Sequence, residues 1–128
     1  MMNYSYTVKT NKDLDSAVKA VEEITAAKSF RVLHIHDVQD TLAGKGFNRE
    51  PYKIIEICNA GFAHKALGAN IDVGLFLPCK INIYTNGGST YISAMRPTMI
   101  ADFFENSDLQ KLAHEVDTIV RSIVDEAK

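Results

Sequence analysis

The sequence has no apolar stretch approaching the roughly 20 residues that a membrane-spanning helix requires. Its first ten residues also lack the charged, apolar and small-residue regions of a secretory signal, so we expect a cytoplasmic protein with no membrane partner. Only two cysteines are present, Cys58 and Cys79, and they lie far apart in the sequence. In a reducing compartment both are expected to be thiols and not a structural disulfide.

An excess of charge of either sign is missing as well. The 14 Lys and Arg residues nearly balance the 16 Asp and Glu residues, which gives a formal net charge of -2. The basic residues are scattered singly, and no basic block is interleaved with aromatic residues. The composition therefore predicts that nucleic acid is not a partner.

The familiar local motifs of catalysis are also absent. Gly44-Lys45-Gly46 does not have the spacing of a phosphate-binding P-loop, and no G-x-S-x-G motif occurs. The carboxylates Glu56, Asp72 and Asp102 show no local pairing of the kind that tunes an acid and a base. Whether the protein is an enzyme stays open, and no cofactor is indicated.

What is present is enough for one domain spanning residues 1–128, since a chain of this length can bury a core and no linker or repeat divides it. Alternating and β-rich segments predict strands, and helical spacing of apolar residues predicts helices. We expect strands near 4–8, 30–36, 52–58, 79–85 and 91–94, with helices near 14–27, 37–44, 59–67, 97–104 and 107–124.

Side chains that favour the first position of a helix mark several of these boundaries. Thr10 or Asn11 is expected to cap the first long helix, Asp37 and Asn59 the two short ones, and Ser107 the last helix through a capping box. These caps predict where the chain changes from extended to helical backbone.

The order of elements predicts the fold class. The residues Asn86-Gly87-Gly88, which accept positive φ, lie between two β-rich flanks and predict a hairpin. The complete order is strand, helix, four strands with short helical insertions, then helices. We therefore expect an α+β fold with a mainly antiparallel sheet of four to five strands and helices packed on one face.

Three segments resemble the signature segments of the domain of unknown function 302 family: Glu56-Ile57-Cys58-Asn59, Gly74-Leu75-Phe76-Leu77-Pro78-Cys79-Lys80 and Ser93-Ala94-Met95-Arg96-Pro97. The resemblance spans nearly the whole chain. It implies a β-α-β(4)-α domain similar in architecture to the TATA-binding-protein-like class, and it implies no activity. An architecture of that class does not itself predict DNA binding, because function resides in the site.

The two cysteines are candidate reactive thiols. Cys58 precedes a predicted helix N-terminus, which favours a thiolate, and Cys79 begins a strand that could lie beside the first. There is no C-x-x-C spacing, and a buried structural role is the more frequent one for cysteine.

The candidate metal ligands are histidines. His34 and His36 flank Ile35 on a predicted strand, so both imidazoles face the same side. A zinc-type site needs further ligands, which His64, Cys58 or Cys79 could supply through tertiary folding. The polar face of an edge strand is the simpler explanation.

The segment 71–77 is unusually apolar for a connection. With Phe62 it could line a ligand pocket or a subunit contact, although filling the core is its commonest role. The candidate pocket or interface residues are Phe62, Val73, Leu75, Phe76 and Leu77.

Two functional hypotheses follow. The first is a small binding or interaction module that self-associates and could take a small-molecule ligand, since an isologous dimer is the commonest way to cover an apolar patch. The alternative is a thiol- or metal-dependent protein for redox or sulfur handling that uses Cys58 and Cys79.

Overall fold

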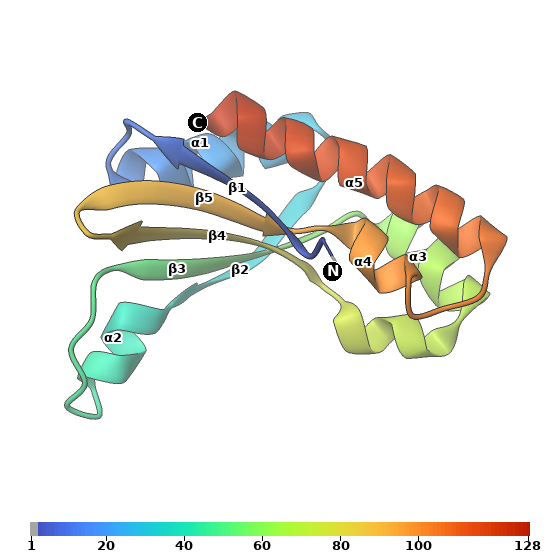
Figure 1. Ribbon diagram of the computed structural model, residues 1–128, viewed down its shortest axis with the longest axis horizontal. Coiled ribbons are helices and arrows are strands. Elements are labelled where there is room, and N and C mark those ends of the chain that lie inside the picture. The colour runs from blue at the N-terminus through green and yellow to red at the C-terminus, as the bar shows by residue number, and fades with distance from the viewer. Residues whose placement is uncertain (1–2) are drawn as a thin grey trace.

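Five antiparallel strands form the sheet at the centre of the computed structural model, which describes residues 3–128 (Figure 1). Their order across the sheet is β1-β5-β4-β3-β2, so β1 and β2 are the two edges. This confirms the predicted antiparallel sheet. The strands are β1 (Ser5–Thr10), β2 (Arg31–Asp37), β3 (Tyr52–Cys58), β4 (Cys79–Asn86) and β5 (Ser89–Met95).

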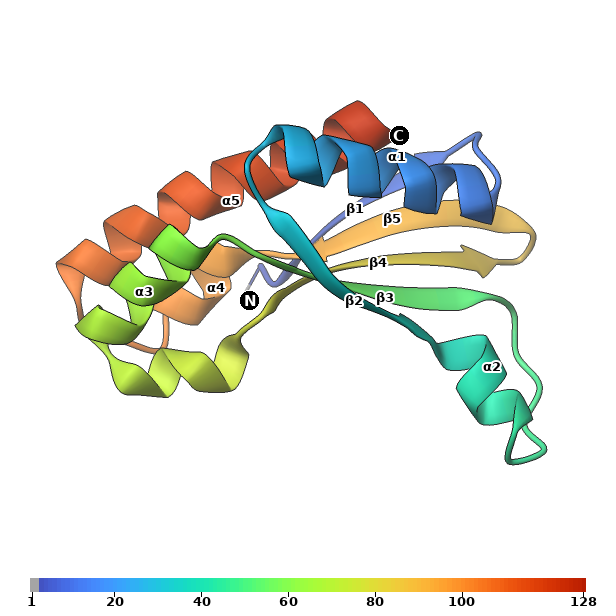
Figure 2. The same cartoon turned by 180° about the vertical axis from the view of Figure 1, so that it is seen from behind.

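Apart from α2, the helices lie on one face and at one end of this sheet (Figures 1 and 2). The two longest, α1 and α5, lie side by side over the same face, and α2 projects from the far end of β2 (Figures 1 and 2). The element order confirms the predicted β-α-β(4)-α arrangement. The helices are α1 (Leu14–Ala27), α2 (Val38–Ala43), α3 (Ala60–Ala69), the 3-10 helix η1 (Ile71–Phe76), α4 (Pro97–Ala101) and α5 (Ser107–Ala127).

The covered face of the sheet is built mainly from isoleucine. Because side chains alternate along a strand, every second residue of β3, β4 and β5 points toward α1 and α5. The faces of α1 and α5 that pack against the sheet carry small and β-branched residues, so the helices and the sheet pack closely. We call this group the body cluster; its fully buried members include Ile55, Ile57, Ile81, Ile83, Ile92, Ala17, Val21, Val120, Ile123 and Val124.

A second, smaller apolar group lies at the end of the molecule where α3, η1 and α4 meet the start of α5 (Figure 1). We call this end of the molecule the tip. The buried residues of this apolar cluster are Ala66, Val73, Ile100 and Leu109. Within residues 3–128, no helix is long and apolar enough to cross a membrane.

Two predicted caps and the predicted hairpin are present as expected. Asp37 accepts a hydrogen bond from the Asp40 amide at 2.9 Å, and Asn59 accepts one from the Phe62 amide at 3.0 Å. In the hairpin, Gly87 and Gly88 both have positive φ, at 61° and 83°, the conformation that glycine adopts most readily.

The other two caps differ from prediction. The cap of α1 is Asp13, whose carboxylate accepts from the Ser16 amide at 2.8 Å, and not Thr10 or Asn11. The cap of α5 is Asn106, which accepts from the Leu109 amide at 2.9 Å, while Ser107 is already helical. In both cases another residue with a side-chain oxygen occupies the last extended position before the helix, where its oxygen reaches the free amides.

A buried ion pair fastens the end of β5 to α5. The Asp117 side chain is 2% exposed and accepts two hydrogen bonds from Arg96, at 3.1 and 2.9 Å, and one from Arg121 at 2.9 Å. Burial acts to raise the pKa of this carboxyl, but the hydrogen bonds and charges of Arg96 and Arg121 outweigh burial and hold the pKa below its ordinary value. This contact joins the segment between β5 and α4 to the middle of α5.

Candidate functional site

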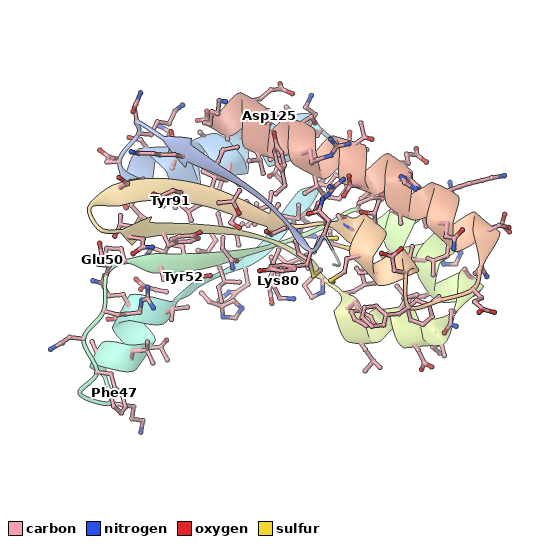
Figure 3. The ribbon with its side chains drawn as sticks, in the orientation of Figure 1. Phe47, Glu50, Tyr52, Lys80, Tyr91 and Asp125 are labelled. Carbon is pink, nitrogen blue, oxygen red and sulfur yellow. The ribbon has the colours of Figure 1, made fainter. Side chains whose placement is uncertain are left out.

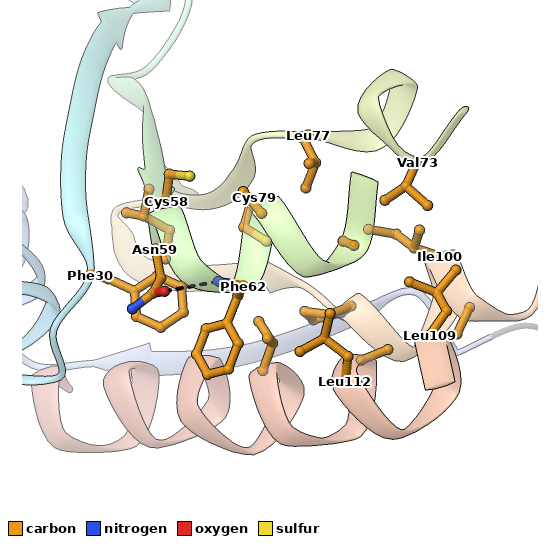
Figure 4. A pocket seen from close by; sticks show the side chains of 17 residues that line it. Phe30, Cys58, Asn59, Phe62, Val73, Leu77, Cys79, Ile100, Leu109 and Leu112 are labelled. Atoms are coloured by element: carbon orange, nitrogen blue, oxygen red, sulfur yellow. Dashed lines mark hydrogen bonds between the residues drawn. The ribbon is translucent and has the colours of Figure 1, made fainter. Parts of the chain in front are cut away.

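An apolar pocket lies where the body cluster meets the tip (Figure 4). It is lined by 17 residues and encloses about 60 Å³. Ile57, Cys79 and Val116 come from the body, whereas Ala66 and Ile100 come from the tip. Neither cluster fills the space between them completely.

The wall offers a ligand almost no hydrogen-bonding group. Asn59 is its only amide side chain, and both polar atoms of that side chain are already engaged. Its Oδ1 accepts from the Phe62 amide, and its Nδ2 donates to the Ser29 carbonyl at 2.9 Å. A guest of this pocket would therefore be held by apolar contact and not by hydrogen bonds.

The 3-10 helix η1 forms one side of the pocket and divides the predicted apolar segment between two environments. Val73, which is 2% exposed, and Leu77 line the cavity. Leu75 is 83% exposed and points away from it. Phe76 is half-buried and stacks on Phe103, with ring centroids 5.3 Å apart. Of the five residues predicted for a pocket or interface, Phe62, Val73 and Leu77 line the pocket.

Both cysteines line this pocket, and neither is in a disulfide. Ile57 pairs with Cys79 across β3 and β4, which places Cys58 one residue away from that pair. Burial, followed by the neighbouring Cys58, raises the pKa of Cys79 to about 11, while Lys80 opposes the shift. Cys79 is therefore a neutral thiol at physiological pH.

The predicted histidines are only partly brought together. His34 and His36 lie on the edge strand β2, with ring centroids 4.3 Å apart, and face the side of the sheet that no long helix covers. The Nε2 atom of His36 is 3.2 Å from a carboxylate oxygen of Glu56. His64 is exposed on α3. Among residues 3–128 no three His, Cys, Asp or Glu side chains are grouped so that they could hold a metal ion.

The same uncovered face carries a row of tyrosines. Tyr52 and Tyr84 stack with ring centroids 5.1 Å apart, and Tyr84 and Tyr91 with centroids 5.6 Å apart. Figure 3 labels Tyr52 and Tyr91 at the two ends of this row. The Arg49 guanidinium covers the outer face of Tyr52, 5.1 Å from its centroid. Each ring is thus stacked on at least one neighbouring ring.

Sequence reasoning missed several pocket residues. Phe30 and Pro97 lie at the boundaries of predicted elements, and Leu112 lies in the last predicted helix; all three line the cavity. The helical spacing of Leu109, Leu112 and Val116 was a signal that Leu112 faces the interior. No spacing in the sequence indicates that a buried stripe will leave a space beside it.

Comparison with known proteins agrees with the fold. A family model described as "Domain of unknown function DUF302" matches residues 6–127. The chain belongs to this family. A solved structure, the crystal structure of an uncharacterized conserved DUF302 protein from Bacillus stearothermophilus, is 30% identical and covers 97% of this chain and 98% of its own, with a TM-score of 0.92. Among curated proteins no match was found. The resemblance inferred from three segments of this DUF302 domain is thereby confirmed.

Proposed function

We propose that this DUF302 domain is a binding module for a small, uncharged, apolar ligand, held in the pocket between body and tip. The observation that carries the proposal is the nature of the wall, which is almost wholly apolar and whose one amide side chain is already hydrogen-bonded within the protein. Ligand sites are typically concave and lined predominantly by apolar side chains.

The volume of the pocket limits the ligand. An engineered apolar cavity of about 150 Å³ holds benzene, and the space here is about 60 Å³. The enclosed part therefore accepts a group smaller than a benzene ring, such as the end of an aliphatic chain. A charged group is disfavoured in this space, since no residue in the wall is charged and a buried charge without a partner is costly.

The test is to fill the pocket and look for loss of a bound molecule. Ala66 lines the cavity from α3, whereas Ala60 is exposed on the same helix. Native mass spectra of protein purified without detergent are expected to show a small adduct in the wild type and in Ala60→Leu, but not in Ala66→Leu. Xenon under pressure provides a second readout, because it enters dry apolar cavities without a natural ligand. Xenon should shift the amide resonances of residues around the pocket in the wild type and in Ala60→Leu, but not in Ala66→Leu.

An adduct that persists in Ala66→Leu would contradict the proposal, as would xenon shifts that are the same in both variants. Circular dichroism of Ala66→Leu shows whether the variant remains folded. If it does not, Ala113→Val adds less volume to the opposite wall and repeats the comparison.

The second candidate is thiol chemistry, and it is favoured by the meeting of Cys58 and Cys79 in one pocket. Hydrogen peroxide would take two electrons and two protons from the pair, so that a sulfur–sulfur bond forms and two molecules of water are released. Cys58 is the more exposed thiol and would meet the oxidant first.

Intact-mass analysis after mild peroxide treatment distinguishes this candidate from simple ligand binding. The expected result is the loss of two hydrogens in the monomer, abolished by either Cys58→Ser or Cys79→Ser. Oxygen addition at Cys58 alone, with no intramolecular bond, would eliminate the dithiol mechanism and leave ligand binding intact.

A further inference from the structure

The outer side of the tip carries an exposed apolar patch that the pocket does not explain. Ile71 is 80% exposed, Leu75 83% and Phe103 56%, and Leu67 and Phe76 complete the group. Two contacts join parts of the patch: a Cβ placed on Gly74, the residue before Leu75, would meet Leu67 at 3.3 Å, and Phe76 stacks on Phe103. We call these five residues the tip patch.

Acidic residues predominate around the tip patch. Segments 67–78 and 99–110, which carry the patch, contain four carboxylates and no Lys, Arg or His, and the exposed His64, Lys65 and Lys111 lie just outside these segments. All four are exposed, and none takes part in an ion pair among residues 3–128. They are Asp72, Asp102, Glu105 and Asp108.

Local helix stability accounts for only part of this charge. Asp72 and Asp108 lie in the first turns of η1 and α5, where a carboxylate is favourable. Asp102 is at the opposite end of its helix, the C-cap of α4, where the partial negative charge of the backbone disfavours a carboxylate. Its position is unfavourable locally and places a negative charge directly beside Phe103.

We propose that the tip patch binds a cationic amphipathic segment of another protein, with apolar side chains on the patch and Lys or Arg residues against the acidic rim. Exposed apolar patches with a polar rim mark interaction sites, and amphipathic segments bind to such surfaces through regularly spaced apolar anchors. Complementary charge selects among partners.

The same charges argue against two other occupants. A second copy placed symmetrically on the patch brings one acidic rim against another, which is repulsive. An anionic membrane surface repels the rim as well. The acidic rim therefore favours a different, basic protein as the partner over a second copy of this chain or an anionic membrane.

A charge-exchange experiment tests the proposal. The probes are two designed amphipathic helical peptides with the same leucine face, one flanked by Lys and the other by Glu, and the measurement is fluorescence anisotropy. The wild type should bind the Lys peptide at least about tenfold more tightly, a difference of about 1.4 kcal/mol. Asp102→Lys with Glu105→Lys should reverse the preference, and higher salt should weaken it.

Matched controls separate the patch from general charge and hydrophobicity. Glu22→Lys with Glu23→Lys changes the same number of exposed charges on α1, and Leu33→Ser removes an exposed leucine from β2. Neither should alter binding, whereas Leu75→Ser should weaken it at least about tenfold.

Several results would overturn the proposal. One is equal binding of the two peptides, or binding of neither. Another is a dimer in the native mass spectrum that Leu75→Ser converts to a monomer, which would make the patch a contact between copies. A third is binding to phosphatidylglycerol vesicles that Leu75→Ser abolishes.

Discussion

The body and the tip are packed by different rules. In the body, fully buried isoleucines of three strands meet α1 and α5. In the tip, short helical segments and the start of α5 share a cluster of only four buried residues, leave a pocket against the body and expose Ile71 and Leu75 to solvent. In the body, side chains repeat at regular spacing along strands and helices, so the two layers fill the space between them. The short segments of the tip have no such regular spacing, and a gap remains beside them. The candidate sites therefore lie where regular packing stops.

The largest difference between the two regions should appear on truncating matched isoleucines. Ile81 belongs to the body, and Ile100 lines the pocket. We expect Ile81→Ala to lower the free energy of unfolding by about 4 kcal/mol. Ile100→Ala should lower it by only about 2 kcal/mol, because the surroundings of Ile100 are already incompletely packed. Urea denaturation measures both. Equal losses would show that the tip is packed as tightly as the body.

Removing the buried ion pair between Arg96 and Asp117 should cost nearly as much. Asp117→Ala leaves Arg96 without its buried partner, and we expect a loss of about 3 kcal/mol at pH 7. The folded pKa of Asp117 is lowered, so its contribution is present above the unfolded pKa and is lost as pH falls through the folded pKa. The difference in stability between wild type and variant should therefore begin to shrink below about pH 4 and continue to shrink as the pH falls further.

A constant difference from pH 7 to pH 3 would contradict that assignment. Glu126 provides a matched control, because its ion pair with Lys28 is largely exposed. Glu126→Ala should change stability by no more than about 1 kcal/mol.

The two cysteines that line the pocket should differ in reactivity. A pKa of about 11 for Cys79, against an ordinary value of 9.0, makes its thiolate about a hundredfold rarer than that of an unperturbed thiol at neutral pH. We expect iodoacetamide at pH 8 to modify Cys58 well before Cys79, as followed by peptide mass mapping. Denaturant should remove the difference. Early modification of Cys79 in the folded protein would show that the pocket is open to water.

The smallest effect on stability is expected at the outer surface of the tip. Leu75 is 83% exposed, so Leu75→Ser should change the free energy of unfolding by less than about 0.5 kcal/mol. Thermal denaturation compares it with Val73→Ser, two residues away but buried in the pocket wall. A large loss from Leu75→Ser would mean that the side chain supports the fold and is not free to bind a partner.

Local pattern was sufficient for much of the architecture. The strands, the Asn86-Gly87-Gly88 hairpin and the caps at Asp37 and Asn59 follow from side-chain period and backbone preference, and all are present. The caps of α1 and α5 were misplaced because several candidate side chains stood close together. Only the backbone conformation decides which of them reaches the free amides.

The site was predictable only in part. The apolar segment 71–77 was correctly identified as unusual, but a sequence does not show which side of a short 3-10 helix will face a cavity. The pairing of β3 with β4 brings Cys58 and Cys79 to one wall, whereas His64 lies on a different element from His34 and His36. Strand register and helix docking decide which of these side chains lie close together in the folded protein.

The sequence by itself determined the alternation of strands and helices, the fold class and the apolar character of the segment before β4. These depend on interactions between residues a few positions apart, which recur wherever the pattern recurs. Only the tertiary structure decided that Val73 is buried while Leu75 is exposed, that a space of about 60 Å³ remains beside both cysteines, and that Asp117 meets Arg96. Those outcomes depend on how whole elements dock, because a cavity or a buried ion pair exists only once distant segments share one surface.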